Sequence, residues 1–178
     1  MKILNVVSTL ILTFTVTACF GQTFSQELEI RNGFKDIKLD STVSSVPNSF
    51  VTETETGKTF HYSGETKYVY NARISALFFE SDYRLKITKI KIFVDHISDE
   101  TFFSLPNSLK ETFGSANYSY KKENKTDGTL VWLSKSNYLE FIYEYQGSGI
   151  WNVLIVVGKF FDLPKELQKL YLKKDDGF

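Results

Sequence analysis

The chain is poor in the residues that build disulfides, metal centres and many catalytic sites. Its 178 residues include one cysteine, Cys19, and two histidines, His61 and His96. A lone cysteine excludes a disulfide within the chain, so the fold must be held together by its core. No spacing of cysteine and histidine suits zinc, and no cofactor is expected. Glu53 and Glu55 share one side of a polar segment and are the remaining candidates for a hard cation, although carboxylates on a solvated strand need no ligand.

An excess of one charge and the common nucleophile and nucleotide motifs are also missing. Lysine plus arginine equals aspartate plus glutamate at 21 each, so no basic field is present to attract nucleic acid. There is no G-x-S-x-G sequence. The triplet Gly57-Lys58-Thr59 matches the end of a phosphate loop, but Thr52 stands where that loop needs glycine, and a strand rather than a helix is expected to follow. These absences favour a non-enzymatic protein.

No apolar run is long enough to span a bilayer comfortably. The uncharged segment 3–16 follows Lys2 and has the length and composition of the apolar part of an export signal. A buried first strand or helix is the alternative. We expect residues 1–18 to direct export.

The sequence leaves open two ways in which this signal could be processed. The residues Val16-Thr17-Ala18-Cys19 resemble the lipobox of bacterial lipoproteins, which implies lipidation of Cys19 and a periplasmic or outer-membrane-anchored protein. Ordinary cleavage after Gly21 or Gln22 would instead release a soluble secreted protein. Either way, any contact with the membrane is expected through a lipid anchor only.

What the chain does have is apolar and aromatic content, at 42% and 16%, enough to build a core. Its clearest pattern is the segment 138–157, where two runs of period two flank a short link containing glycine. This arrangement predicts a β-hairpin. One set of in-phase residues is expected to face the core: Leu139, Phe141, Tyr143, Tyr145, Trp151, Val153, Ile155 and Val157.

A second hairpin is predicted over residues 74–94, with a bulge near Thr88 that reconciles two phases of apolar residues. A helix is predicted from Ser98 as N-cap to Gly114 as C-cap, kinked or split at Pro106. Shorter elements are expected around these two. They are a strand at 34–39, a helix at 41–46, an edge strand or hairpin at 50–62, strands at 118–122 and 130–133, and a last helix at 163–173 capped by Asp162.

Shifting the chain by 65 residues superposes the patterns of the two hairpins, which suggests a tandem helix-then-hairpin duplication with halves 34–95 and 96–157. We therefore expect a tether at 19–32, one α+β domain at 33–174 and a frayed tail at 175–178. The predicted fold class is α+β, with an antiparallel sheet and helices packed on one face.

The segment FKDIKLDSTVSSV is similar to the strand-turn-helix opening of small exported α+β domains, with Asp40 where a glycine is usual. Such domains include the small lipoproteins of outer-membrane assembly and the β-lactamase inhibitor proteins. The resemblance is one of architecture over residues 34–157. It implies a binding or scaffold role, and it carries over no functional residue.

Two functions remain open at this point. The first is a non-enzymatic interaction module of the cell envelope with an unknown protein partner, which would use outward-facing tyrosines because tyrosine commonly anchors interfaces. The alternative is a small-ligand-binding protein or weak hydrolase with a pocket between sheet and helices, lined by His61 or His96. The candidate tyrosines are Tyr68, Tyr70, Tyr118 and Tyr120.

Overall fold

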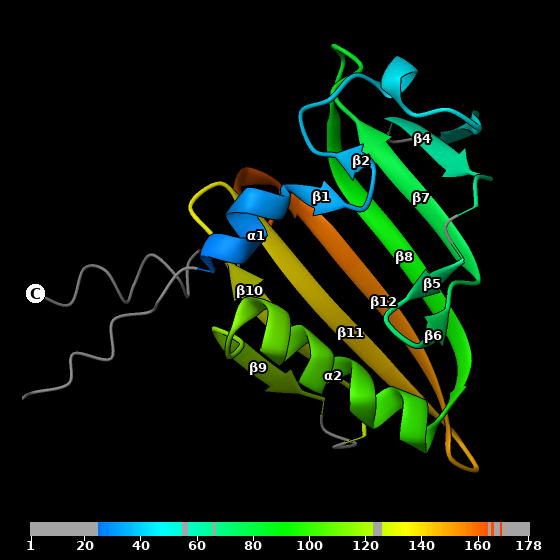
Figure 1. Ribbon diagram of the computed structural model, residues 1–178, viewed down its shortest axis with the longest axis vertical. Helices are drawn as coiled ribbons and strands as arrows, with labels where there is room; N and C mark the ends of the chain where they lie inside the picture. The colour runs from blue at the N-terminus through cyan, green and yellow to red at the C-terminus, as the bar shows by residue number, and fades with distance from the viewer. Residues whose placement is uncertain are drawn as a thin grey trace, which may run out of the picture.

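The protein is built on an eight-stranded antiparallel sheet, seen in a computed structural model that describes residues 25–54, 57–65, 67–122, 126–163, 165 and 168 (Figure 1). The strand order is β3-β4-β7-β8-β12-β11-β10-β9. The strands are β3 (Ser49–Thr54), β4 (Gly57–Tyr62), β7 (Ala76–Ser81), β8 (Ile87–Ser98), β9 (Tyr118–Lys121), β10 (Gly128–Leu133), β11 (Asn137–Gly147) and β12 (Ile150–Lys159).

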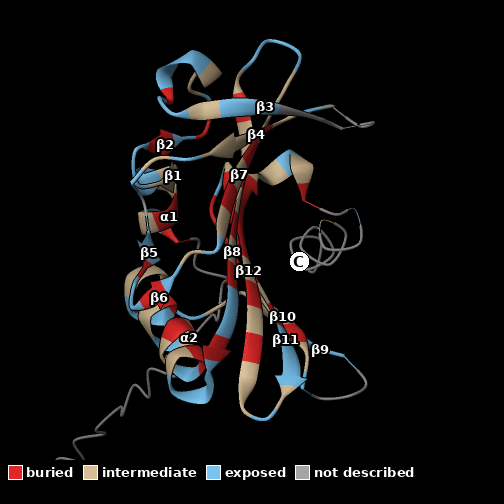
Figure 2. Ribbon diagram, turned by 90° about the vertical axis from the view of Figure 1, so that its right-hand side faces the viewer, coloured by how far each residue is buried: buried red, intermediate tan, exposed pale blue. Residues whose placement is uncertain are grey.

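One face of the sheet, which we call the helix face, is covered by a second layer (Figure 2). This layer holds helices α1 (Gln26–Arg31) and α2 (Asp99–Phe113) and two small hairpins, β1–β2 (Gly33–Phe34 and Ile37–Lys38) and β5–β6 (Tyr68–Val69 and Ala72–Arg73). The α+β fold with an antiparallel sheet and helices on one face is therefore confirmed. None of the described helices is long and apolar enough to cross a membrane.

The hairpin predicted over 138–157 is confirmed as β11–β12, at the centre of the sheet. Its register pairs Leu139 with Val157 and Phe141 with Ile155. Of the residues expected to face the core, all but Tyr145 belong to the main apolar cluster under the helices. Tyr145 lies beside Trp151 near the end of β11 and is 37% exposed, because the covering layer does not bury this end of the strand fully. Alternation alone decided this because one face of the hairpin is far more apolar than the other.

The hairpin predicted over 74–94 is also confirmed, as β7–β8. Glu80 pairs with Lys89 and Ser81 with Ile87, so Thr88 is the extra residue of a bulge, as predicted. The bulge restores the phase of the strand, because Ile87 on one side and Ile90 on the other are both fully buried.

The two proposed halves of the chain contribute the two halves of the sheet. Strands β3, β4, β7 and β8 come from the first and β9 to β12 from the second, each set in the same relative order, and they meet where β8 pairs with β12. The helices do not match. The helix expected at 41–46 is only a 3-10 turn, η1 (Val43–Ser45), and the Thr42 side chain does not cap it.

Helix α2 begins as predicted, with the Ser98 hydroxyl accepting from the Thr101 amide. The predicted break at Pro106 is wrong, because the helix continues to Phe113. Phe102, Leu105 and Leu109 are buried on either side of the proline. Their packing on the sheet holds both halves of the helix in line despite the lost backbone hydrogen bond.

The tether expected at 19–32 is wrong from Ser25 onward. Ser25 caps α1 by accepting from the Leu28 amide, and Leu28 is 1% exposed in the main core. Glu29 accepts hydrogen bonds from the hydroxyl and amide of Ser136, at 2.7 and 3.1 Å. The domain thus begins earlier than the sequence indicated, since a helix of six residues with one buried anchor shows no periodicity.

Several predictions fall where the structure says little. The export signal, Cys19 and the tail at 175–178 lie outside the described residues, as does most of the helix expected at 163–173. Asp162, predicted as the cap of that helix, is the last residue of a 3-10 turn, η2 (Phe160–Asp162), on the face opposite α2 (Figure 2).

Candidate functional site

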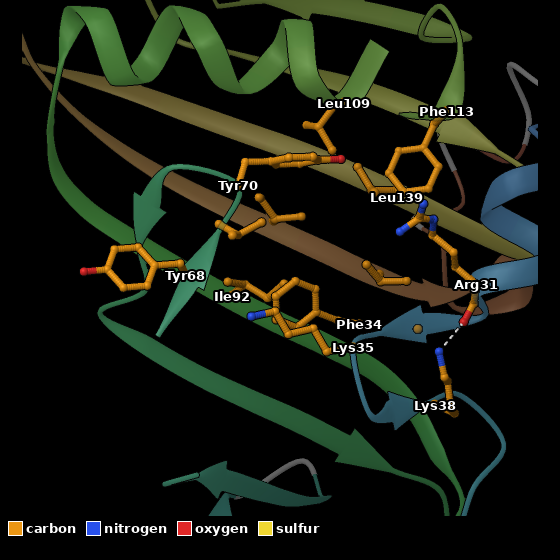
Figure 3. Close-up of a pocket in the computed structure, with 14 residues that line it drawn as sticks. Arg31, Phe34, Lys35, Lys38, Tyr68, Tyr70, Ile92, Leu109, Phe113 and Leu139 are labelled. Atoms are coloured by element: carbon orange, nitrogen blue, oxygen red, sulfur yellow. Dashed lines mark hydrogen bonds between the residues drawn. The ribbon is translucent and has the colours of Figure 1, made fainter. Parts of the chain in front are cut away.

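A cavity of about 380 Å³ lies between the helix face of the sheet and the covering layer (Figure 3). Strands β8, β11 and β12 form its floor, α2 forms one wall, and the end of α1 with the two small hairpins forms the rest. Its lining residues are Arg31, Gly33, Phe34, Lys35, Lys38, Tyr68, Val69, Tyr70, Ile92, Leu109, Phe113, Leu139, Ile155 and Val157.

The inner part of the cavity is apolar. Ile92, Leu139, Ile155 and Val157 come from three adjacent strands, and each is at most 3% exposed. Leu109 and the half-buried Phe113 face them from α2. The cavity exists because no side chain of the covering layer fills the space between the end of α1 and the β5–β6 hairpin.

The mouth of the cavity is cationic. Arg31, Lys35 and Lys38 are its charged lining residues, and all three are exposed. The Lys38 ammonium donates to the Arg31 carbonyl at 2.9 Å, as the dashed line in Figure 3 shows. The Lys35 ammonium lies 5.7 Å from the centre of the Phe34 ring. These contacts leave most ammonium donors of both lysines to solvent or to a ligand.

Arg31 occupies the edge of the mouth nearest α1. Its Nε donates to Glu27 at 2.6 Å, and its guanidinium carbon lies 5.9 Å from the centre of the Phe113 ring. Both partners of this ion pair are well exposed, so the pair adds little stability and Arg31 remains available to another anion. No aspartate or glutamate is among the lining residues.

Two of the four predicted tyrosines line this cavity. Tyr68 and Tyr70 belong to the β5–β6 hairpin, at 52% and 43% exposure. The Tyr70 hydroxyl donates to Thr112 Oγ1 at 2.8 Å and ties the hairpin to α2. In Figure 3 the Tyr70 ring lies beside Leu109, while the Tyr68 hydroxyl points away from the other labelled side chains.

The other two tyrosines lie elsewhere, so the prediction of one tyrosine surface is wrong. Tyr118 and Tyr120 belong to β9 and share the face of the sheet opposite the helices. Tyr118 packs against a second apolar cluster there, and Tyr120 is 63% exposed. Tyr68 and Tyr70 lie apart from them because β5–β6 is a separate two-stranded hairpin and not part of the eight-stranded sheet.

His61 does not line the cavity. It lies on β4 with its ring between those of Phe50 and Phe78, at centroid distances of 4.7 and 4.9 Å. Phe79, next to Phe78, is fully buried on the helix face, so Phe78 and His61 face the opposite side. The prediction that His61 lines a pocket between sheet and helices is wrong.

His96 does not line the cavity either. It sits in a bulge of β8 with φ of 56°, and its amide donates to Asn152 Oδ1 at 3.0 Å. A separate open hollow is bordered by His96 and Asp95. Ser75 also borders it and donates to Asp95 Oδ2 at 2.7 Å. The same hydroxyl also lies 2.9 Å from the Phe93 carbonyl oxygen.

Buried ionisable groups lie on the face opposite the cavity. Glu140 is 8% exposed, and burial raises the pKa of its carboxyl, against the opposing charge of Lys89. Tyr138 is 1% exposed, and burial is the main cause that raises the pKa of its hydroxyl, with the carboxylates of Glu140, Asp162 and Glu80 adding to it. These groups take no part in the cavity.

Comparisons with known proteins add no function. No protein-family model matches the chain, and no curated protein matches its sequence. One similar solved structure is that of YjgB from Bacillus subtilis subsp. subtilis str. 168, a DUF4309 family protein. It shares 10% sequence identity, covers 68% of this chain and 81% of its own, and superposes with a TM-score of 0.42.

Metal binding gains no support from the described part of the chain, where no group of three or more acidic, histidine or cysteine side chains gathers. The Glu53 side chain and Glu55 lie outside the described residues. Sequence reasoning missed Arg31, Lys35 and Lys38, which looked like the solvated positions of a tether and a short strand. Their spacing held no signal that they border a cavity, because its other walls come from distant parts of the chain.

Proposed function

We propose that the protein is a non-enzymatic binding protein of the cell envelope that takes a small, largely apolar ligand into the cavity between sheet and helices. The cavity itself is the observation that carries this proposal. Its volume of about 380 Å³ falls within the range of small-molecule sites, and its apolar floor with a few polar groups at the mouth is the usual arrangement of such sites.

A small-ligand site and a protein-docking site need different surfaces. A protein partner was expected to bind a continuous face of four tyrosines, and these tyrosines are divided between two faces. The cavity needs no such surface. Tyr68 and Tyr70 then serve as part of its wall rather than as anchors for a protein.

A neutral fluorescent probe tests the cavity directly. Nile red should bind the wild-type full chain saturably with a blue-shifted emission, because the probe enters apolar surroundings. Val157→Phe projects a larger side chain into the cavity from its floor and should weaken the binding about tenfold or more. Thermal unfolding checks that the variant remains folded.

The matched control is Leu154→Phe, on the same strand but on the opposite face, where Leu154 is half-buried. It introduces the same phenylalanine side chain, with a somewhat smaller gain in volume, and should leave Nile red binding unchanged. Equal binding by the wild type and Val157→Phe, or no saturable binding at all, would refute a site in the cavity.

The envelope location rests on the N-terminal sequence alone. We propose that residues 1–18 direct export and that Cys19 carries a lipid. Expression in a bacterial host with a labelled fatty acid should label the wild type and leave Cys19→Ser unlabelled. An unlabelled wild type would refute the anchor and leave a soluble exported protein as the alternative.

A further inference from the structure

We infer that the ligand of this cavity is a single-chain amphiphile with an anionic head, bound with its head at the cationic mouth and its apolar chain along the floor. This inference rests on the proposed binding function and specifies its ligand class. It follows from how charge and apolar surface are divided within one cavity.

The charge of the lining is of one sign. Arg31, Lys35 and Lys38 lie within eight consecutive residues, where α1 passes into the β1–β2 hairpin, so they gather on one side of the mouth (Figure 3). No lining carboxylate offsets them. A cationic head would be repelled by these three lining groups, whereas a carboxylate or phosphate is met by guanidinium and ammonium donors.

The apolar surface lies at the other end. Ile92, Ile155 and Val157 on the floor offer no side-chain hydrogen bond, so a charged head placed there would lose its hydration without compensation. An alkyl chain placed there is removed from water. The head is therefore directed to the mouth and the chain to the floor, which sets one orientation for the ligand.

The charged side chains at the mouth are held loosely enough to rearrange around an incoming anion. Arg31 is paired with Glu27 in an exposed ion pair, and an incoming anion can share or replace that partner at little cost. The ammonium of Lys38 has one protein acceptor, the Arg31 carbonyl, which leaves donors for a ligand. The mouth thus offers hydrogen-bond donors that are not all engaged in interactions within the protein.

Displacement of Nile red from the full chain tests the head group. Laurate, dodecanol and dodecyltrimethylammonium share one chain length and differ in head charge, and each is used below its micellar concentration. Laurate should displace the probe about tenfold more effectively than dodecanol, and dodecyltrimethylammonium should be the weakest. Among alkyl carboxylates, affinity should rise about fourfold per methylene until the cavity is filled.

The matched variants reverse charge at two sites. Lys35→Glu combined with Lys38→Glu should weaken laurate about tenfold and leave Nile red binding unchanged. Lys110→Glu combined with Lys135→Glu makes the same change in net charge on exposed residues outside the cavity and should keep laurate binding. A second experiment compares laurate with lauroyl lysophosphatidate on the wild type. Tighter binding of lauroyl lysophosphatidate would identify a phospholipid headgroup as the anionic head of the ligand, and weaker binding would identify a free fatty acid.

Equal displacement by the three head groups would overturn the inference, as would laurate binding that survives reversal at Lys35 and Lys38. In both of these cases the wild type would still bind Nile red and Val157→Phe would still weaken that binding, so the proposed binding function would stand. Loss of Nile red binding to the wild type is the separate result that refutes the binding function itself.

Discussion

Phe102→Ala should lower the free energy of unfolding by about 3–5 kcal/mol, the usual cost of removing a buried phenylalanine. Phe102 is 5% exposed on α2. Its ring stacks on that of Trp151 with centroids 3.8 Å apart and planes 3° from parallel, and it also contacts Tyr143 at 5.4 Å. Removing it opens a void between α2 and β12. Urea unfolding followed by tryptophan fluorescence measures the loss.

Phe103→Ala is the control for this prediction. Phe103 follows Phe102 on the same helix but is 59% exposed, so the two variants change helix propensity equally and differ in buried surface. Its loss should be below about 1 kcal/mol. Similar losses for the two variants would show that α2 does not pack through Phe102 as the structure describes.

Trp132→Ala is the second large expected effect, again about 3–5 kcal/mol of unfolding free energy. Trp132 lies on β10 at 1% exposure and is the largest fully buried side chain. Its indole N–H donates to the Gly114 carbonyl at 2.8 Å, directly after the end of α2. The residue therefore fills the core and fixes the end of the helix at once.

Trp132→Phe separates these two roles. It keeps most of the apolar volume and removes the hydrogen bond, which is worth about 0.5–1.5 kcal/mol because the exposed Gly114 carbonyl can turn to water. The loss should therefore be well under half that of Trp132→Ala. Equal losses in thermal or urea unfolding would contradict a mainly packing role for Trp132.

Together Phe102 and Trp132 hold α2 over the sheet from its first turns to its end. Leu109 and Phe113 lie on α2 between Phe102 and Gly114, the residue that Trp132 contacts, and they form a wall of the cavity. The shape of the site thus depends on packing that lies outside it.

The strands that carry the floor of the cavity could be predicted because their signal is local. Alternation along residues 139–157 specified which side of β11 and β12 is buried, and a change of phase placed the bulge at Thr88. The helix at 99–113 followed from its caps. The break predicted at Pro106 was wrong because the packing of Phe102 and Leu109 on the sheet outweighs the backbone hydrogen bond lost at the proline.

The walls of the cavity could not be predicted because they come from separate parts of the chain. Arg31 and Lys38 precede the sheet, Tyr70 lies in a small hairpin and Phe113 ends a helix. No pattern within one window links these positions. The histidines were chosen for their chemistry, and the fold placed His61 on the opposite face.

The sequence by itself determined an antiparallel α+β fold, the central hairpin 138–157 and the apolar side of that hairpin, because period-two alternation assigns faces wherever one side is buried. Only the tertiary structure decided that a space remains between this face and its covering layer, and that Arg31, Lys35 and Lys38 border it. The reason is physical. A cavity is volume left unfilled by side chains from distant segments, and that remainder depends on how the elements pack rather than on the pattern of any one of them.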